Sequence, residues 1–300
     1  MTPAGRRMPA ASGLVIVDKP AGQTSHDVVA QIRRLAGTRR VGHAGTLDPM
    51  ATGVLVIGVE KATRLLGHLA LTEKEYTGTI RLGQATDTDD ADGVIIAETS
   101  AAAVSQAALE AAAAALTGEI QQVPPGFSAI KVSGKRAYRL AREGAAPELA
   151  ARTVTVSSFT VLAVRRRGGL LDADVAVTCS SGTYIRALAR DLGAALGVGG
   201  HLTALRRTRV GPYEIGQART LEQLETSFTV IPLAEAADMA FRRLNLTEED
   251  ARLVAHGRRL PGAKLGVGPG PVAAFAPDGS LIALLTEEAG QARPLAVFVP

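Results

Sequence analysis

The sequence predicts an α+β fold with a mixed, mainly antiparallel sheet and a small β-rich domain at the C-terminal end. Two β-rich runs, 154–166 and 170–180, are joined by a short Arg-Gly-Gly connection that is typical of an antiparallel hairpin. Runs with helical spacing of apolar residues occur between such strands. Near residue 240 the pattern changes to short strands separated by Gly and Pro. We therefore expect a flexible tail at 1–12, a main domain at 13–238 and a small domain at 239–300.

Composition supports a folded chain with an aliphatic core. Of 300 residues, 46% are hydrophobic and only 3% are aromatic, so Leu, Val, Ile and Ala must fill the core. The net charge of +4 is compatible with a polyanionic partner, although GC-rich coding would produce the same excess of Arg. Basic residues form two clusters, which would make an RNA track if they share one face: Arg33, Arg34, Arg39 and Arg40, and then Arg206, Arg207 and Arg209.

Cysteine content and hydropathy indicate a cytoplasmic protein without a membrane segment. Cys179 is the sole cysteine, which excludes an intramolecular disulfide and a Cys-based zinc site and suits a reducing compartment. We expect it to pack as a small core residue. Asp18 and Lys19 interrupt the first apolar stretch before a signal-peptide core develops. No apolar run approaches the roughly 20 residues of a membrane span.

The N-terminal elements follow from turn and cap signals. A buried strand is expected at 13–17, and Ser25 is a good N-cap for a helix that runs to Gly37. The segment 40–49 has no periodicity and is expected to be a loop of the kind that carries an active site. Strands are expected at 54–59 and, by alternation, at 76–82.

The later elements are predicted in the same way. The Ala-rich run 101–116, closed by Gly118, predicts a helix, and another is expected at 183–196. Thr247 begins a pattern that resembles a capping box. Short strands are expected at the following places: 272–275, 281–285 and 295–299, with a turn at 277–279.

Several local patterns would suggest other functions, and none of them holds. The acidic stretch 87–93 resembles a calcium loop, but Ala91 and Asp92 occupy positions that need a ligand and a glycine. The glycine-rich stretches match neither a Walker loop nor a dinucleotide fingerprint. The five histidines lack the spacing of a metalloprotease. We therefore predict no metal.

The most unusual segment is 42–55, Gly-His-Ala-Gly-Thr-Leu-Asp-Pro-Met-Ala-Thr-Gly-Val-Leu, with an acid between a Leu and a Pro. Pro49 restricts its own φ and pushes Asp48 toward an extended conformation, which holds the carboxylate on a stiffened backbone. On these grounds alone, Asp48 is either a turn-capping residue or a functional carboxylate.

This segment closely resembles the catalytic motif of bacterial tRNA pseudouridine-55 synthases, the TruB family. Further blocks resemble the family in the expected order over residues 13–215, and five ordered blocks are not a chance agreement. They are Gly13–Pro20 with Gly22 and Thr24–Ser25, Glu73–Tyr76, Gly83 with Thr86–Asp89 and Gly93, Pro124–Pro125 with Phe127–Lys131 and Gly134–Tyr138, and Ser181–Arg186. The resemblance implies a pseudouridine synthase type of sheet and a PUA-like C-terminal domain.

The resemblance also implies roles for individual residues. Asp48 would be the catalytic nucleophile, Tyr76 would contact the target base, and Arg186 would be the ion-pair partner that keeps the carboxylate charged. His43 would occupy the stack vacated by the flipped base. The expected RNA-binding residues are Lys19, Arg39, Arg40, His43, Lys131 and Tyr184, with Lys19 and the arginines on phosphates.

The implied substrate is the T-stem-loop of transfer RNA, and the default state is a monomer. Net isomerisation needs no redox cofactor, while attack at C1′, attack at C6 and a glycal route stay open. The alternatives are a ribosomal or guide-RNA-dependent synthase and, from another class, an RNA-folding factor with a vestigial site. The motif Thr46-Leu47-Asp48-Pro49 favours the tRNA branch.

Overall fold

The computed structural model describes residues 11–127, 131–132, 135–136, 149–261, 265 and 270–299, and of 131–132, 135–136 and 261 it describes the backbone alone. Almost all of the expected tail at 1–12 lies outside these residues. The chain forms two compact units. Unit 1 comprises residues 1–49, 53–71 and 210–300, and unit 2 comprises residues 50–52 and 72–209. Each unit is described by itself below.

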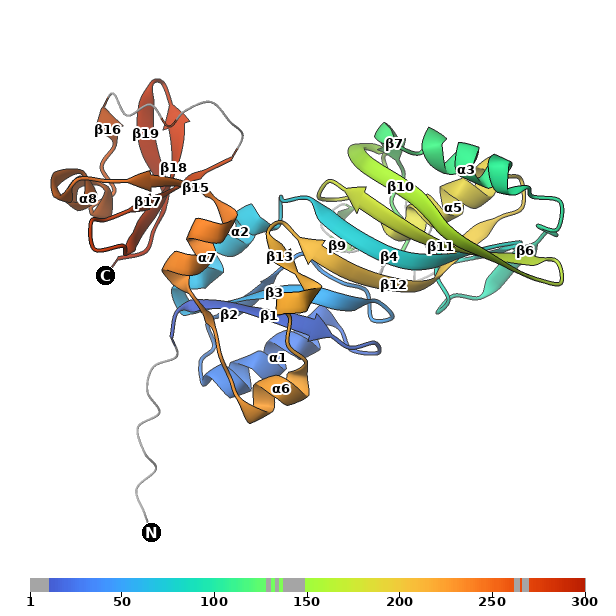
Figure 1. The fold of residues 1–300 in the computed structure, drawn as a ribbon, viewed down its shortest axis with the longest axis horizontal. Helices are drawn as coiled ribbons and strands as arrows, with labels where there is room; N and C mark the ends of the chain where they lie inside the picture. The colour runs from blue at the N-terminus through green and yellow to red at the C-terminus, as the bar shows by residue number, and fades with distance from the viewer. Residues whose placement is uncertain are drawn as a thin grey trace, which may run out of the picture. The chain divides into compact units, whose positions relative to one another are not determined.

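The N-terminal part of unit 1 is a small sheet with strand order β14-β1-β3 and with β2 also on β3. All of these pairs are antiparallel (Figure 1). Its elements are β1 (Gly13–Lys19), α1 (Ser25–Ala36), β2 (Val41–Ala44), β3 (Thr52–Val59), the 3-10 helix η1 (Glu60–Leu65) and α2 (Leu66–Leu69). After the excursion into unit 2 follow β13 (Tyr213–Glu214), η2 (Ile215–Gln217), α6 (Leu221–Thr226), β14 (Ile231–Pro232) and α7 (Leu233–Ala240).

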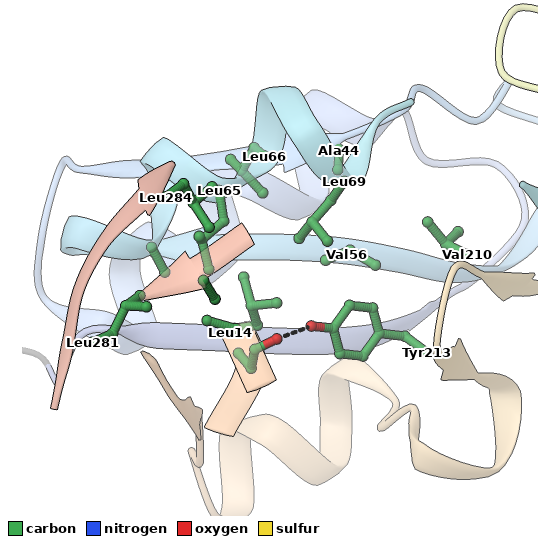
Figure 2. Close-up of a cluster of buried hydrophobic side chains, with 14 of the residues drawn as sticks. Leu14, Ala44, Val56, Leu65, Leu66, Leu69, Val210, Tyr213, Leu281 and Leu284 are labelled. Atoms are coloured by element: carbon green, nitrogen blue, oxygen red, sulfur yellow. Dashed lines mark hydrogen bonds between the residues drawn. The ribbon is translucent and has the colours of Figure 1, made fainter. Parts of the chain in front are cut away.

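Strand β1 is buried on both faces because its alternate side chains enter two different hydrophobic clusters. Val15 and Val17 pack with α1 and α6 residues on one side. Leu14 and Ile16 face the other cluster, which includes Tyr213 and Phe275 (Figure 2). The Tyr213 hydroxyl donates to the carbonyl of Ala236 at 2.8 Å. A strand covered on both faces reads as a continuous apolar run, which is why the sequence predicted it correctly.

The C-terminal end of unit 1 is a five-stranded sheet in the order β15-β17-β18-β19-β16. Its elements are β15 (Arg242–Asn245), α8 (Glu248–Ala255), β16 (Leu260–Pro261), β17 (Val272–Phe275), β18 (Leu281–Glu288) and β19 (Gln291–Val297). The predicted small β-rich domain is confirmed. Leu281 and Leu284 of this sheet join the same cluster as Leu14 (Figure 2). The boundary at 238/239 stays a prediction.

Unit 2 is built on a sheet with strand order β12-β4-β11-β10-β7. The pairs β4–β11, β11–β10 and β10–β7 are antiparallel, so the predicted mainly antiparallel sheet is confirmed. Its elements are β4 (Lys74–Leu82), β5 (Gln84–Thr86), β6 (Ile95–Glu98), α3 (Gln106–Ala115), β7 (Gly118–Gln122), β8 (Lys131–Val132), β9 (Lys135–Arg136), β10 (Arg152–Arg167), β11 (Leu170–Cys179), α5 (Ile185–Ala195) and β12 (Gly200–Val210).

The hairpin β10–β11 matches the prediction, and β11 alternates as expected. Its inward side chains, Leu171, Ala173, Val175, Val177 and Cys179, are at most 2% exposed. Cys179 is thus a core residue, and burial raises the pKa of its thiol to about 11. The other face carries Asp172 and Asp174, so the sheet is amphipathic.

Three local predictions needed correction. Segment 40–49 is not entirely a loop, because 41–44 form β2 and pair with β3. The helix expected at 101–116 is shorter, since Ser105 caps it and accepts from Ala108 N. The first helix is capped by Thr24 rather than by Ser25, in a capping box with Asp27. Either residue can cap, and only tertiary contacts decide between them.

Candidate active site

The segment that carries Asp48 is held by bonds on both sides of the aspartate. Ser25 Oγ accepts from Leu47 N at 2.9 Å and donates to Leu47 O at 3.2 Å. On the other side, the Pro49 carbonyl accepts from Gly22 N at 2.8 Å and from Lys19 Nζ at 3.2 Å. Leu47 is buried, whereas Asp48 is half-buried. The backbone of Asp48 is therefore fixed between two anchored residues, while the residue itself keeps part of its surface exposed.

Lys19 is buried, whereas the sequence predicted that its side chain contacts a phosphate. Its ammonium group donates to the carbonyls of Pro20, Gln23 and Pro49, and the residue has 0% exposure. A side chain without exposed surface does not reach a phosphate in this conformation, so the buried position argues against the phosphate contact, which stays a prediction. Three converging carbonyls provide the partners that a buried ammonium requires. Lys19 is a residue that holds the loop carrying Asp48.

Of the other expected RNA-binding residues of unit 1, the two arginines are exposed and the histidine is half-buried. Arg39 and Arg40 are exposed in the turn between α1 and β2, and Arg40 forms an ion pair with Glu60 at 3.7 Å. His43 is half-buried on β2, and its ring stands edge-on to that of His26 at 5.6 Å. His26 is exposed on α1, and sequence reasoning had assigned it no role.

Tyr76 and Arg186 belong to unit 2. Tyr76 lies opposite Val177 in the β4–β11 pair and is 8% exposed. Two residues earlier, Lys74 is 5% exposed and donates to Thr72 O at 2.7 Å. Burial, together with the charge of the nearby Arg207, lowers the pKa of Lys74 to about 8. This end of β4 thus buries an ammonium group.

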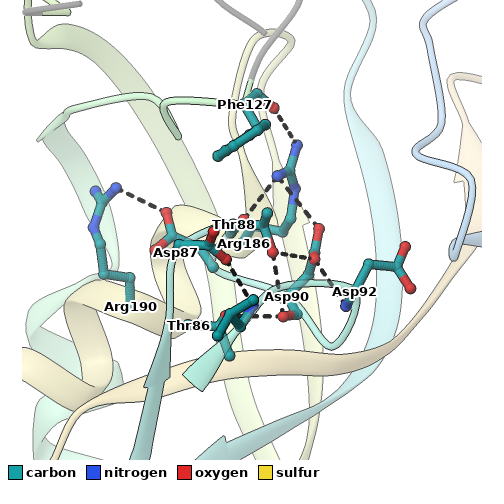
Figure 3. Close-up of polar contacts among 10 residues, drawn as sticks. Thr86, Asp87, Thr88, Asp90, Asp92, Phe127, Arg186 and Arg190 are labelled. Carbon is teal, nitrogen blue, oxygen red and sulfur yellow. Dashed lines mark hydrogen bonds and ion pairs between the residues drawn. The ribbon is translucent and has the colours of Figure 1, made fainter. Parts of the chain in front are cut away.

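Arg186 is 4% exposed in the first turn of α5, and its guanidinium group is bound by the loop 86–93 (Figure 3). It donates to Thr88 O at 2.8 Å and to Phe127 O at 3.0 Å, and it forms an ion pair with Asp90 at 3.3 Å. Asp90 in turn accepts from Thr88 Oγ1 and from Asp92 N. The acidic stretch that resembled a calcium loop therefore carries the carboxylate that pairs with Arg186.

Asp90 was missed as a site residue, although a signal was available. The run 83–100 contains five acids and no Lys or Arg, so any of its carboxylates that are buried need cationic partners from elsewhere in the chain. The sequence does not say which cations these are. Arg186 and Arg190 are that pair in the structure, about 100 residues away. Among the described residues, no cluster of His, Cys, Asp and Glu could hold a metal ion.

Tyr184 and Gln122 determine where α5 begins. Gln122 has 0% exposure; its Oε1 accepts from Tyr184 N at 2.8 Å, and its Nε2 donates to Tyr184 O at 3.2 Å. Tyr184 is half-buried as the N-cap residue. The backbone of Lys131 is in β8, and its side chain lies outside the part of the chain that the structure describes.

The second arginine cluster is not a simple basic patch. Arg207 is 1% exposed, and Arg209 is bound by Glu73 at 2.8 Å and Glu75 at 2.7 Å. Arg206 donates to Thr52 Oγ1 at 3.2 Å. Because Arg207 is buried and Arg209 is paired, these two charges are less available to an RNA than the sequence suggested.

Solved structures with the same fold belong to multi-component complexes. The chain superimposes with a TM-score of 0.72 and 28% identity on a chain of a Cbf5–Nop10–Gar1 complex, covering 96% of this chain and 85% of that one. With 25% identity and a TM-score of 0.70, it matches a chain of an H/ACA RNP bound to a substrate RNA, covering 99% and 92%.

Three family models together cover most of the chain. They are described as TruB family pseudouridylate synthase, N-terminal domain (33–185), tRNA pseudouridylate synthase B C-terminal domain (186–244) and tRNA pseudouridine synthase II, C-terminal (241–299). The first model contains Asp48 and Tyr76. The protein is therefore an enzyme of the pseudouridine synthase class, an isomerase.

Curated relatives agree over almost the full length. The protein named tRNA pseudouridine synthase B from Thermobifida fusca is 62% identical over 96% of this chain and 99% of its own. That from Streptomyces coelicolor is 62% identical over 95% and 97%, and that from Mycobacterium bovis is 55% identical over 96% of each. The chain belongs to the TruB family of tRNA pseudouridine synthases, which isomerise uridine to pseudouridine in transfer RNA.

Proposed function

We propose that this protein isomerises the uridine at position 55, in the T-loop of transfer RNA, with Asp48 as the nucleophile. One observation carries the assignment of Asp48: its neighbours Leu47 and Pro49 are both anchored to the segment 19–25, while the aspartate itself keeps access. A turn-capping role would not require anchors on both sides. Rigid support of this kind is what a reacting carboxylate needs.

The chemistry needs only groups that the chain provides. The N1–C1′ bond breaks, the uracil rotates, and C5 bonds to C1′; C5 then loses a proton and N1 gains one, so atoms balance without a redox partner. A carboxylate such as Asp48 can capture or stabilise an electron-poor sugar carbon, or remove a proton from the sugar. Routes through C1′, C6 or a glycal all use the same carboxylate.

Arg186 is proposed as the positive charge that keeps the Asp48 carboxylate ionised. Its guanidinium is nearly without solvent contact, and Asp90 and two carbonyls hold it in one orientation. A fixed buried cation favours the ionised form of an acid beside it. Tyr76 is proposed to stack on the extruded uracil, an interaction worth about 1–3 kcal/mol.

Recognition of the RNA is assigned to residues of both units. His43 is proposed to fill the stack vacated by the flipped base, since unstacking costs a few kcal/mol. Arg39 and Arg40 are proposed phosphate contacts, and Lys131 and Tyr184 further RNA contacts.

The described helices include none that is long and apolar enough to cross a membrane. We further propose that the enzyme acts as a monomer in the cytoplasm.

The assignment is tested with unmodified tRNA transcript and purified protein, mapping pseudouridine by carbodiimide-dependent reverse-transcription stops. We expect a single product in the T-loop, loss of product in Asp48→Asn, and full activity in Asp278→Asn, which changes an exposed turn carboxylate. An isolated T-stem-loop is expected to suffice. Product on ribosomal RNA alone would overturn the substrate. Product that persists in Asp48→Asn would overturn the nucleophile. RNA binding without product would favour a folding factor.

A further inference from the structure

A second arginine lies one helical turn beyond Arg186. Arg190 is on the same face of α5, at the i,i+4 position, and it contacts the same two segments of the chain. Its Nη1 bonds to Asp89 Oδ2 at 3.1 Å, and its Nη2 donates to Val123 O at 2.8 Å. Arg186 likewise forms an ion pair with Asp90 and donates to Phe127 O (Figure 3). Each of the two arginines therefore links the loop 86–93 to the segment 123–127.

Asp89 has an unusual backbone that needs such support. Its φ is 60°, in the left-handed region that residues other than glycine rarely adopt. Its carbonyl accepts from Leu202 N at 3.0 Å, and the residue is only 8% exposed. Burial raises the pKa of the Asp89 carboxyl, and Arg190 is the largest influence that opposes this rise. The ion pair with Arg190 is thus the main contact that favours a charged Asp89 in this conformation.

The conformation of Asp89 bears on Asp90 because the two residues are adjacent. The left-handed turn at Asp89 directs the chain so that the carboxylate of Asp90 meets Arg186 while that of Asp89 meets Arg190. If Asp89 relaxed to an ordinary conformation, the peptide linking it to Asp90 would rotate. The Asp90 carboxylate would then leave the guanidinium of Arg186.

We propose that the Arg190–Asp89 pair is a positioning device for the reaction. It holds the loop so that Asp90 keeps Arg186 in its working orientation. This inference rests on the proposed role of Arg186 toward Asp48. Neither Arg190 nor Asp89 is assigned a contact with the RNA, so both act through another residue.

The test compares Arg190→Met and Asp89→Asn with the wild type in single-turnover assays on tRNA. We expect the rate of the chemical step to fall by roughly 10-fold, as for a misplaced supporting group, with tRNA affinity unchanged. Arg190→Lys keeps a charge near Asp89 and is expected to recover part of the rate. The matched control is Arg165→Met, which removes the ion pair with Asp174 on the opposite, polar face of the sheet and leaves the rate unchanged.

A double-mutant cycle separates positioning from general destabilisation. If Arg190 acts through the Asp90–Arg186 pair, Arg190→Met has no further effect on the rate in an Asp90→Asn protein. Effects that multiply, or a wild-type rate in both Arg190→Met and Asp89→Asn, would overturn the inference. If Arg190→Met does not fold, Asp89→Asn and Arg190→Lys give the same test in proteins whose melting is checked first.

Failure of this inference differs from failure of the proposed function. Loss of activity in Asp48→Asn and Asp90→Asn, together with unaffected Arg190 variants, would remove only the positioning role. Activity retained in Asp48→Asn would remove the nucleophile, whatever the Arg190 variants do.

Discussion

At the scale of single residues, the support of the Asp48 loop comes from side chains that looked ordinary in the sequence. Ser25 was expected to cap a helix, and Lys19 was expected to bind phosphate. In the structure, Ser25 forms hydrogen bonds with both backbone groups of Leu47, and the ammonium group of Lys19 donates to three carbonyls. Each assignment makes a separate prediction.

Substitution Ser25→Ala should lower both stability and activity. It leaves the buried Leu47 N–H and carbonyl without their partner, which costs about 1–3 kcal/mol in the free energy of unfolding. It also loosens the residue next to Asp48, so we expect the turnover rate to fall by roughly 3- to 10-fold. Urea unfolding and single-turnover rates measure the two effects.

The control for this prediction is Ser105→Ala. Ser105 caps α3 through Ala108 N at 3.1 Å, and losing it costs about 1 kcal/mol. Its loss is expected to lower stability without lowering the rate. An equal loss of rate in both variants would show that Ser25 acts through stability alone.

The burial of Lys19 predicts how its removal affects salt dependence. An ammonium with no exposed surface releases no counterion when RNA binds, so Lys19→Met should leave the slope of log Kd against log salt unchanged. The exposed Arg39 is the comparison, because Arg39→Ala should reduce the slope by about one. Filter-binding titrations at several salt concentrations measure both. A reduced slope in Lys19→Met would support the phosphate contact that the sequence predicted.

At the scale of elements, the position of α5 depends on a contact between β7 and the helix start. The side-chain amide of Gln122 forms hydrogen bonds with both backbone groups of Tyr184, and Arg186 follows two residues later. Helix N-termini leave N–H groups that need partners from outside the helix. A side chain from β7 fills this role because Tyr184 has no oxygen that could cap its own helix in the manner of Ser or Thr.

Substitution Gln122→Met should therefore weaken the start of α5. It keeps a side chain of similar length but leaves the Tyr184 N–H unpaired, which costs about 1–3 kcal/mol. Chemical denaturation measures this loss, and hydrogen exchange should show faster exchange in the first turn of α5. The neighbouring Gln121→Met removes only an exposed bond to Thr153. If Gln121→Met destabilises the protein as much, the assigned role of Gln122 is wrong.

The open polar face of the unit 2 sheet is stabilised by cross-strand ion pairs. Arg81 bonds to both oxygens of Asp172, at 2.7 and 2.8 Å, and Arg165 and Thr79 bond to Asp174. Such pairs compensate the charges of neighbouring strands and align their register. They also link the stability of the sheet to pH.

At the scale of the whole molecule, these carboxylates predict acid sensitivity. The hydrogen bond from Arg165 lowers the pKa of Asp174 from 3.8 to about 2, and that from Arg81 lowers the pKa of Asp172. Because the folded pKa lies below the unfolded one, the stabilisation is complete above about pH 4. It disappears as the pH falls toward the folded value.

Substitution Asp174→Asn should remove part of this pH dependence. We expect a loss of about 0.2–1 kcal/mol at pH 7, since the pair is partly exposed, and a smaller loss at pH 2.5. Urea unfolding at the two pH values measures the difference. Glu119→Gln, an exposed carboxylate on β7, is the control. A loss at pH 2.5 as large as that at pH 7 would contradict the linkage.

Much of the architecture followed from the sequence, because its signals are local. The alternation of β11, the glycine connection of the hairpin and the apolar run of β1 each report how one segment meets a core. The Asp48 motif is local too, and its resemblance to a family rests on residues that are contiguous in the chain. These features determined the fold class, the enzyme class and the candidate nucleophile.

Tertiary structure decided which polar groups serve which partners. Arg186 bonds to residues 88, 90 and 127 among others, and nothing in the local pattern near residue 186 indicates these three. Thr24 rather than Ser25 caps α1 because Leu47 takes the Ser25 hydroxyl. The buried ammonium group of Lys19 takes one of its acceptors from the distant Pro49 carbonyl. Pairing between remote segments depends on how strands and loops meet in space, and residue order along one segment does not encode that.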